Sequence, residues 1–90
     1  MAVTPLHSAA AAGQVEVARI LIEAGTPVDE RQSGGWTPLH SAAQNGDVEL
    51  VRLLLASGAD PSLANDAGET PADLAAERGH DDLLAALGDA

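Results

Sequence analysis

A seven-residue motif occurs twice in this chain and returns once more in altered form, always after the same interval. The motif Thr-Pro-Leu-His-Ser-Ala-Ala begins at Thr4 and again at Thr37, and the altered form Thr-Pro-Ala-Asp-Leu-Ala-Ala begins at Thr70. A fixed period of this length is typical of repeat proteins, in which each unit stacks on its neighbours. We therefore expect residues 1–90 to form one domain with three repeats, approximately 4–36, 37–69 and 70–90.

Each repeat predicts a pair of helices. In the second repeat Thr37 is suited to cap a helix that has Pro38 in its first turn, where a missing N–H costs nothing. Gly46 is suited to end this helix, and Asp47 to cap a second one over residues 48–56. The second helix is apolar on nearly all sides, so neighbouring helices must cover it.

The motif Thr-Pro-Leu-His-x-Ala, returning from Thr4 to Thr37 at this period, resembles the ankyrin repeat. This resemblance implies an all-α repeat solenoid, with stacked helix-turn-helix pairs and projecting β-hairpin loops over residues 26–36 and 59–69. It also implies that His7 and His40 tie their helices to neighbouring backbone by hydrogen bonds. Asp73 replaces this histidine in the third repeat, as is common in terminal repeats of the family, and we expect it to lie in the first turn of its helix.

The two ends of the array differ in polarity. The last repeat has Asp81 and Ala86 where earlier repeats have larger apolar residues, and this loss of apolar bulk predicts a capping repeat. The first repeat keeps Val17 and Ile20, so its outer face is less well capped. We expect a monomer. The alternatives for the N-terminal face are that an upstream segment covers it or that it mediates self-association.

The charge of the chain disfavours two classes of partner. Fourteen acidic residues against four basic ones give a net charge of −10, which repels phosphate backbones and anionic membranes. We expect no nucleic-acid partner and no membrane association. The acidity has two open explanations, solubility or complementarity to a basic partner. The chain has no cysteine, no run of 18 apolar residues and no recognisable signal peptide, so the expected location is cytoplasmic.

The polar residues do not form a recognisable catalytic pattern. His7 and His40 occupy equivalent positions in successive repeats, about 10 Å apart if the helices pack normally, which is too far to share a metal ion. Ser41 follows His40 directly, and adjacent residues on a helix point in different directions. We expect no enzymatic activity, no cofactor and no metal.

The resemblance implies that the chain binds another protein through the loop tips and the exposed side of the first helices, which would line a concave groove. Trp36, the only aromatic residue, is either an anchor for the partner or packs back on its own repeat. Asp66, Glu69 and Glu77 favour a partner segment rich in Arg or Lys. Asn65 is also expected at a tip. The predicted partner-binding residues are Gln32, Ser33, Trp36, Ser41, Gln44, Asn45, Asp66, Glu69, Leu74, Glu77 and Arg78.

The predicted function is that of a non-enzymatic protein-interaction module. Two alternatives remain open. The repeats could be a structural or assembly segment of a larger protein, or a small inhibitor that occludes an enzyme.

Overall fold

The computed structural model describes residues 4–88 and shows three consecutive pairs of helices. The family resemblance and the helix boundaries predicted for the second repeat are consistent with this architecture. A short 3-10 turn, η1 (Ser33–Gly35), lies in the first loop. The α-helices are α1 (Pro5–Ala11), α2 (Val15–Glu23), α3 (Pro38–Asn45), α4 (Val48–Ala56), α5 (Pro71–Glu77) and α6 (Asp81–Gly88).

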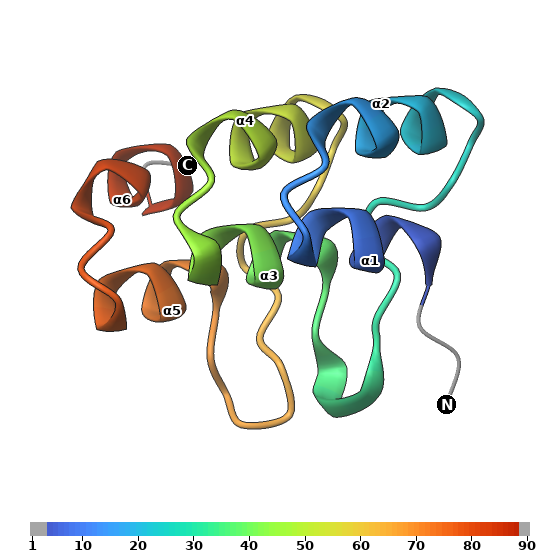
Figure 1. The fold of residues 1–90 in the computed structure, drawn as a ribbon. Coiled ribbons are helices and arrows are strands. Elements are labelled where there is room, and N and C mark those ends of the chain that lie inside the picture. The colour runs from blue at the N-terminus through green and yellow to red at the C-terminus, as the bar shows by residue number, and fades with distance from the viewer. Residues whose placement is uncertain (1–3, 89–90) are drawn as a thin grey trace.

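The helices form two layers (Figure 1). The first helices of the repeats, α1, α3 and α5, lie side by side in one layer, and α2, α4 and α6 lie in the other. The loops that connect α2 to α3 and α4 to α5 project beyond the first layer, away from the second. The result is an all-α stack in which the first and last repeats form the two ends.

The repeated Thr-Pro motif starts the first helix of each repeat. The hydroxyl of Thr37 accepts a hydrogen bond from the backbone N–H of His40 (3.4 Å), and Nδ1 of His40 accepts one from the N–H of Thr37 (3.1 Å). Thr70 and Asp73 form the same reciprocal pair, with distances of 3.3 and 3.0 Å. These bonds satisfy N–H groups that a helix start would otherwise leave unpaired, and they confirm the predicted place of Asp73.

The first repeat lacks the second half of this arrangement. The N–H of Thr4 donates to the side-chain oxygen of Gln32 rather than to His7. His7 instead contacts the hydroxyl of Ser41 through Nε2 (3.1 Å), and within the described residues its buried Nδ1 has no hydrogen-bond partner. The expected link of this histidine to neighbouring backbone is therefore wrong for His7, which bonds to a side chain of the next repeat.

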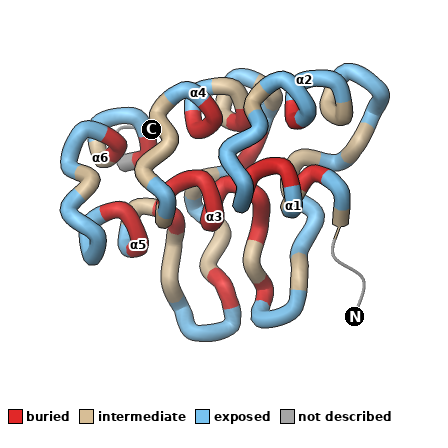
Figure 2. Tube along the Cα trace, in the orientation of Figure 1, coloured by how far each residue is buried: buried red, intermediate tan, exposed pale blue. Residues whose placement is uncertain are grey.

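The core lies between the two layers and along the contacts between repeats (Figure 2). In α4 the side chains of Leu50, Val51 and Leu54 are fully buried, because α2 covers the helix on one side and α6 on the other. This confirms that the second helix of the middle repeat is sandwiched. The other fully buried leucines come from all three repeats: Leu6, Leu39 and Leu83.

The ends of the stack match the predicted difference in polarity. Asp81, Asp82 and Ala86 are exposed on α6, as expected of a capping repeat. On α2 two large apolar side chains are exposed instead, Val17 at 44% and Ile20 at 62%.

The projecting loops are hairpin-shaped, but no residue between 4 and 88 forms a β-strand. The expected β-hairpins are therefore replaced by loops closed by a few hydrogen bonds near their tips. Each loop contains a proline, Pro27 or Pro61, which cannot donate to a strand ladder.

Truncation of a core leucine tests the packing of the middle repeat. Leu54→Ala is expected to lower the free energy of unfolding by about 2–5 kcal/mol, because it leaves a cavity in the centre of a small core. Urea denaturation followed by circular dichroism measures this loss. Ile20→Ala is the matched control, since Ile20 lies on the second helix of an end repeat and is largely exposed; a comparable loss in both variants would contradict the packing described here.

Candidate interaction surface

The two projecting loops, residues 26–36 and 59–69, form a surface that we call the loop ledge. Each loop is closed near its tip by a backbone hydrogen bond, from Gln32 N–H to the Trp36 carbonyl (2.7 Å) and from Asn65 N–H to the Glu69 carbonyl (2.8 Å). These two bonds involve equivalent positions of the first and second repeats. The hydrogen-bonding pattern of the loop backbone therefore repeats with the same period as the sequence.

The side chain of Asn65 holds the second loop in shape. Its Oδ1 accepts hydrogen bonds from the N–H groups of Ala67 (3.0 Å) and Glu69 (2.9 Å), and its Nδ2 donates to the Glu69 carboxylate (3.0 Å). Asn65 is buried. The expectation that it lies at a tip available to a partner is wrong, because its amide satisfies the turn itself.

The two loops are joined to each other. The N–H of Asp66 donates to the Gly34 carbonyl (2.8 Å), and Nη1 of Arg31 donates to the Ala64 carbonyl (3.0 Å). Gly35 has a positive φ of 76°, and a Cβ there would lie 2.6 Å from Oδ1 of Asp66. A larger residue at position 35 would push the loops apart, so this glycine permits the ledge to close.

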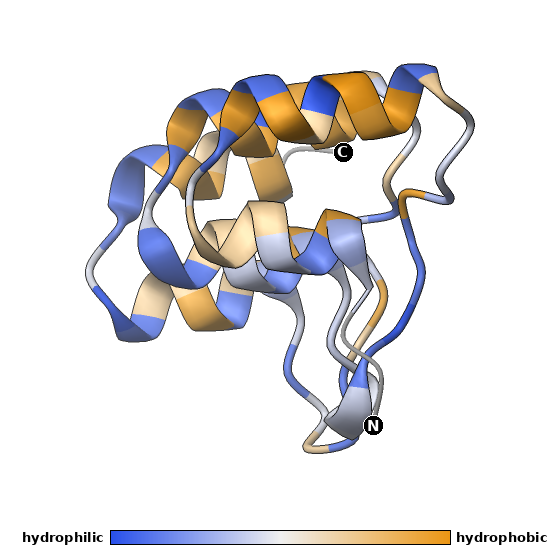
Figure 3. Ribbon diagram, turned by 45° about the vertical axis from the view of Figure 1, so that its right-hand side comes forward, coloured by the Kyte–Doolittle hydropathy of each residue, from blue (hydrophilic) through white to orange (hydrophobic). Residues whose placement is uncertain are grey.

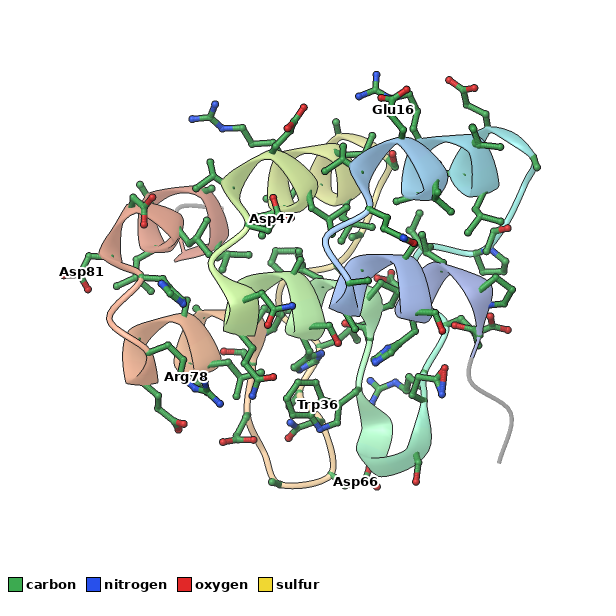
Figure 4. All side chains as sticks on the ribbon, in the orientation of Figure 1. Glu16, Trp36, Asp47, Asp66, Arg78 and Asp81 are labelled. Carbon is green, nitrogen blue, oxygen red and sulfur yellow. The ribbon has the colours of Figure 1, made fainter. Side chains whose placement is uncertain are left out.

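Trp36 lies where the first loop meets α3 (Figure 4). Its ring centroid is 5.7 Å from that of His40, with the ring planes tilted by 51°, and it also lies close to Gly34. The side chain is half-buried. Trp36 therefore packs partly on its own repeat, as one of the two interpretations predicts, and keeps part of its surface open to solvent.

Two of the predicted partner-binding residues are buried. Ser41 is 5% exposed and Leu74 is 4% exposed. Ser41 lies against the preceding repeat, where its hydroxyl contacts His7, and Leu74 is part of the packing of α5. Their assignment to the binding surface is wrong because both point into contacts between helices.

Other predicted residues lie at the surface but already have contacts. The Asn45 amide donates to the Ala11 carbonyl (2.9 Å) and links the first two repeats. The backbone carbonyl of the half-buried Gln44 accepts a hydrogen bond from His80 Nε2 (3.1 Å), which links the last two repeats without using the Gln44 side chain. The Gln32 side chain is held by Thr4. The contacts at Asn45 and Gln44 place neighbouring repeats relative to one another, whereas that of Gln32 ties the first loop to the start of α1 in its own repeat.

The remaining predicted residues are available on the ledge and at the end of α5. Ser33, Asp66, Glu77 and Arg78 are exposed, and Glu69 is half-buried. Figure 4 shows Asp66 near the loop tips and Arg78 on α5, on the same side of the molecule as Trp36. The candidate surface thus combines one partly open aromatic ring with several carboxylates.

The histidine beneath Trp36 is held in one neutral form. Nδ1 of His40 accepts from Thr37 N–H, so Nε2 carries the proton and donates to the Glu69 carbonyl (2.8 Å). Burial lowers the pKa of the His40 imidazole below its ordinary value of 6.5, and the positive charge of Arg31 adds to this effect. Protonation of Nδ1 would remove the acceptor that caps α3. His40 is therefore a structural link, as the resemblance implies.

The described residues form no other recognisable site. Within residues 4–88 there is no group of three His, Cys, Asp or Glu side chains that could hold a metal ion, and no enclosed pocket. None of the helices described is long and apolar enough to span a membrane. The candidate surface is open and shaped by the loops.

Comparison with known proteins agrees with the architecture. The family model for ankyrin repeats matches residues 6–89 with three copies. The chain is an ankyrin-repeat protein. No curated protein matches it. Ankyrin repeats are generally protein-interaction modules, so the family supports a protein partner without identifying one.

Sequence reasoning missed the contacts that join the ankyrin repeats to one another. Arg31 bonds to Ala64, Ser41 to His7 and Asn45 to Ala11, each pair separated by 33 or 34 residues. The period predicts that such segments are neighbours. It does not indicate which side chains reach across, because the repeats differ at several of these positions.

The protonation of His40 predicts a pH dependence of stability. Its pKa is lower in the folded protein than in the unfolded chain, so the unfolded chain binds more protons as the pH falls through 6.5. Over the pH range below 7 the free energy of unfolding is expected to decrease as this group takes up a proton on unfolding, by at most about 1.4 kcal/mol per pH unit. Urea denaturation across this pH range measures the slope.

The variant His40→Asn cannot titrate but keeps an acceptor for Thr37, as Asp73 does for Thr70. It is expected to be less stable than the wild type at pH 7 and to show a shallower dependence on pH. Equal slopes in the two proteins would mean that His40 does not take up a proton on unfolding.

Proposed function

We propose that the chain is a non-catalytic module that binds another protein through the loop ledge and the adjoining end of α5. The observation that carries this proposal is the position of Trp36, the only aromatic side chain, half-buried at the junction of the ledge with α3. A tryptophan that is already held on one side loses little freedom when a partner covers the other. The family supports the general role.

The charge around Trp36 favours a partner with a basic segment. Asp66 and Glu77 are exposed, and the carboxylate of Glu69 is only partly engaged by Asn65. These groups belong to a chain with a net charge of −10, which attracts a basic segment at long range and repels nucleic acid and anionic membranes. Binding of this kind weakens as salt screens the charges.

The ledge is suited to contact rather than to chemistry. Its polar groups are mostly committed to holding the loops, as Asn65 and Arg31 illustrate. We therefore propose that the module acts by occupying a surface of its partner. A cytoplasmic location fits the absence of cysteine, since no disulfide is needed to hold the loops.

Affinity capture from native lysate, read by mass spectrometry, tests this proposal. The triple variant Trp36→Ala, Asp66→Asn, Glu77→Gln removes the aromatic ring and two exposed carboxylates without touching Asn65 or the capping bonds. Recovery of the partner is expected to fall more than about tenfold, since loss of an interface tryptophan alone costs on the order of 2 kcal/mol.

The matched control is Glu16→Gln with Glu49→Gln, which removes two exposed carboxylates from α2 and α4 in the other layer. It is expected to recover the partner as the wild type does. Equal recovery by the triple variant would place the interaction elsewhere. Trp36 fluorescence during titration with an Arg-rich peptide provides a direct readout, because the chain has no other tryptophan.

A further inference from the structure

The N-terminal face of the stack has the apolar character of an internal interface. Val17, Leu50 and Leu83 occupy equivalent positions in the three repeats. The preceding repeat buries Leu50 and Leu83 completely, whereas Val17 is 44% exposed. Ile20 is 62% exposed, while the equivalent Leu53 is half-buried against the core. The first repeat thus presents a surface that the second and third repeats use for packing.

This N-terminal face is uncharged. We define it by the exposed residues of 5–23 whose equivalents in the second repeat are more buried: Pro5, Ser8, Ala11, Gly13, Gln14, Val17 and Ile20. Glu30 and Arg31, which meet the same criterion, belong to the following loop and not to this helical surface. None of the residues that define the face carries a charge, although the chain as a whole carries −10. Figure 3 brings this end of the molecule forward and shows the hydrophobic colour that runs along α2. An exposed apolar patch on an otherwise acidic protein marks an association surface.

We propose that the N-terminal face binds the N-terminal face of a second copy of this chain, related by a two-fold axis. Val17 and Ile20 lie one helical turn apart on α2. With two copies of α2 antiparallel, Val17 of each chain meets Ile20 of the other, and both contacts form at once. Within the chain α2 contacts α4 and α4 contacts α6 as parallel neighbours, and the proposed interface would extend this layer of helices by an antiparallel pair.

A head-to-tail arrangement of copies is disfavoured by the other end of the stack. That end exposes Asp81 and Asp82 on α6, and Ala86 stands where the first repeat has Ile20. Stacking it on Val17 and Ile20 would desolvate carboxylates without giving them partners. A basic partner is also disfavoured, since the N-terminal face offers it no carboxylate. A second copy supplies an uncharged apolar surface that matches the first.

The charges near this face lie at its edge. Glu16 and Arg19 form an ion pair on α2 (3.4 Å), and the Glu16 side chain is 81% exposed. Figure 4 shows Glu16 directed away from the α1 layer, on the outer surface of α2. Glu16 lies one helical turn from Ile20, so in the proposed dimer the two ion pairs lie at the border of the contact, where added salt screens them.

The association is expected to be weak and to strengthen with salt. The face is small compared with stable dimer interfaces, and two chains of charge −10 repel each other at long range. Added salt screens this repulsion and leaves apolar contact intact. The proposed binding of a basic partner at the loop ledge has the opposite salt dependence, so the two interactions are distinguishable.

Sedimentation equilibrium over about 10 μM to 1 mM protein, at low and high salt, tests this inference. The wild-type chain is expected to shift from the mass of one chain toward that of two, more strongly at high salt. Ile20→Asp buries a carboxylate in the proposed contact and is expected to weaken dimerisation more than about tenfold. Ile20 is largely exposed in one chain, so this variant should keep the circular dichroism of the wild type.

The matched control is Ala85→Asp, which adds the same charge at an exposed position of α6, where the first two repeats have Arg19 and Arg52. It is expected to dimerise as the wild type does. A wild-type chain that remains monomeric at all protein and salt concentrations would overturn the proposal. The N-terminal face would then bind something else, such as a preceding repeat. Dimerisation unaffected by Ile20→Asp would also overturn it. Trp36→Ala should leave the dimer unchanged, which separates this surface from the loop ledge.

Discussion

The imidazole of His40 connects three parts of the molecule, and the arrangement of the middle repeat depends on it. Its Nδ1 accepts from Thr37 at the start of α3, its Nε2 donates to the Glu69 carbonyl at the end of the second loop, and its ring packs against Trp36 at the end of the first. A single neutral tautomer makes both hydrogen bonds. The same residue therefore caps a helix and ties both loops to the layer formed by α1, α3 and α5.

The stack presents three surfaces of different chemistry. The loop ledge combines Trp36 with carboxylates and is held by bonds between loops. The C-terminal end is acidic and suited to solvent, with Asp81 and Asp82 in the first turn of α6, where the helix dipole favours negative charge. The N-terminal face is uncharged and partly apolar. A short array has few buried leucines, so differences between its ends affect a large part of the surface.

The helices and their caps were predictable because they depend on local sequence. Thr37 and Pro38 start α3, Gly46 ends it with a φ of 71°, and α4 spans Val48–Ala56 as expected. The binding surface was predicted less well. Ser41 and Leu74 were assigned to it, yet both are buried, because the side of a two-turn helix that faces a neighbour depends on how the repeats pack. The buried role of Asn65 depends on the closure of its own loop.

By itself the sequence determined the repeat, the helix pairs, the caps and the contrast between the two ends, since the constant period and the choice of Thr, Pro and Gly act through neighbouring backbone. Only the tertiary structure decided which side chains remain available. Trp36 is half-buried because His40 and Gly34 lie beside it, and Val17 is exposed whereas Leu50 is not, because only Leu50 has a repeat packed in front of it. Whether a side chain is exposed depends on neighbours that are distant in sequence, and only the packing of the repeats brings those neighbours into place.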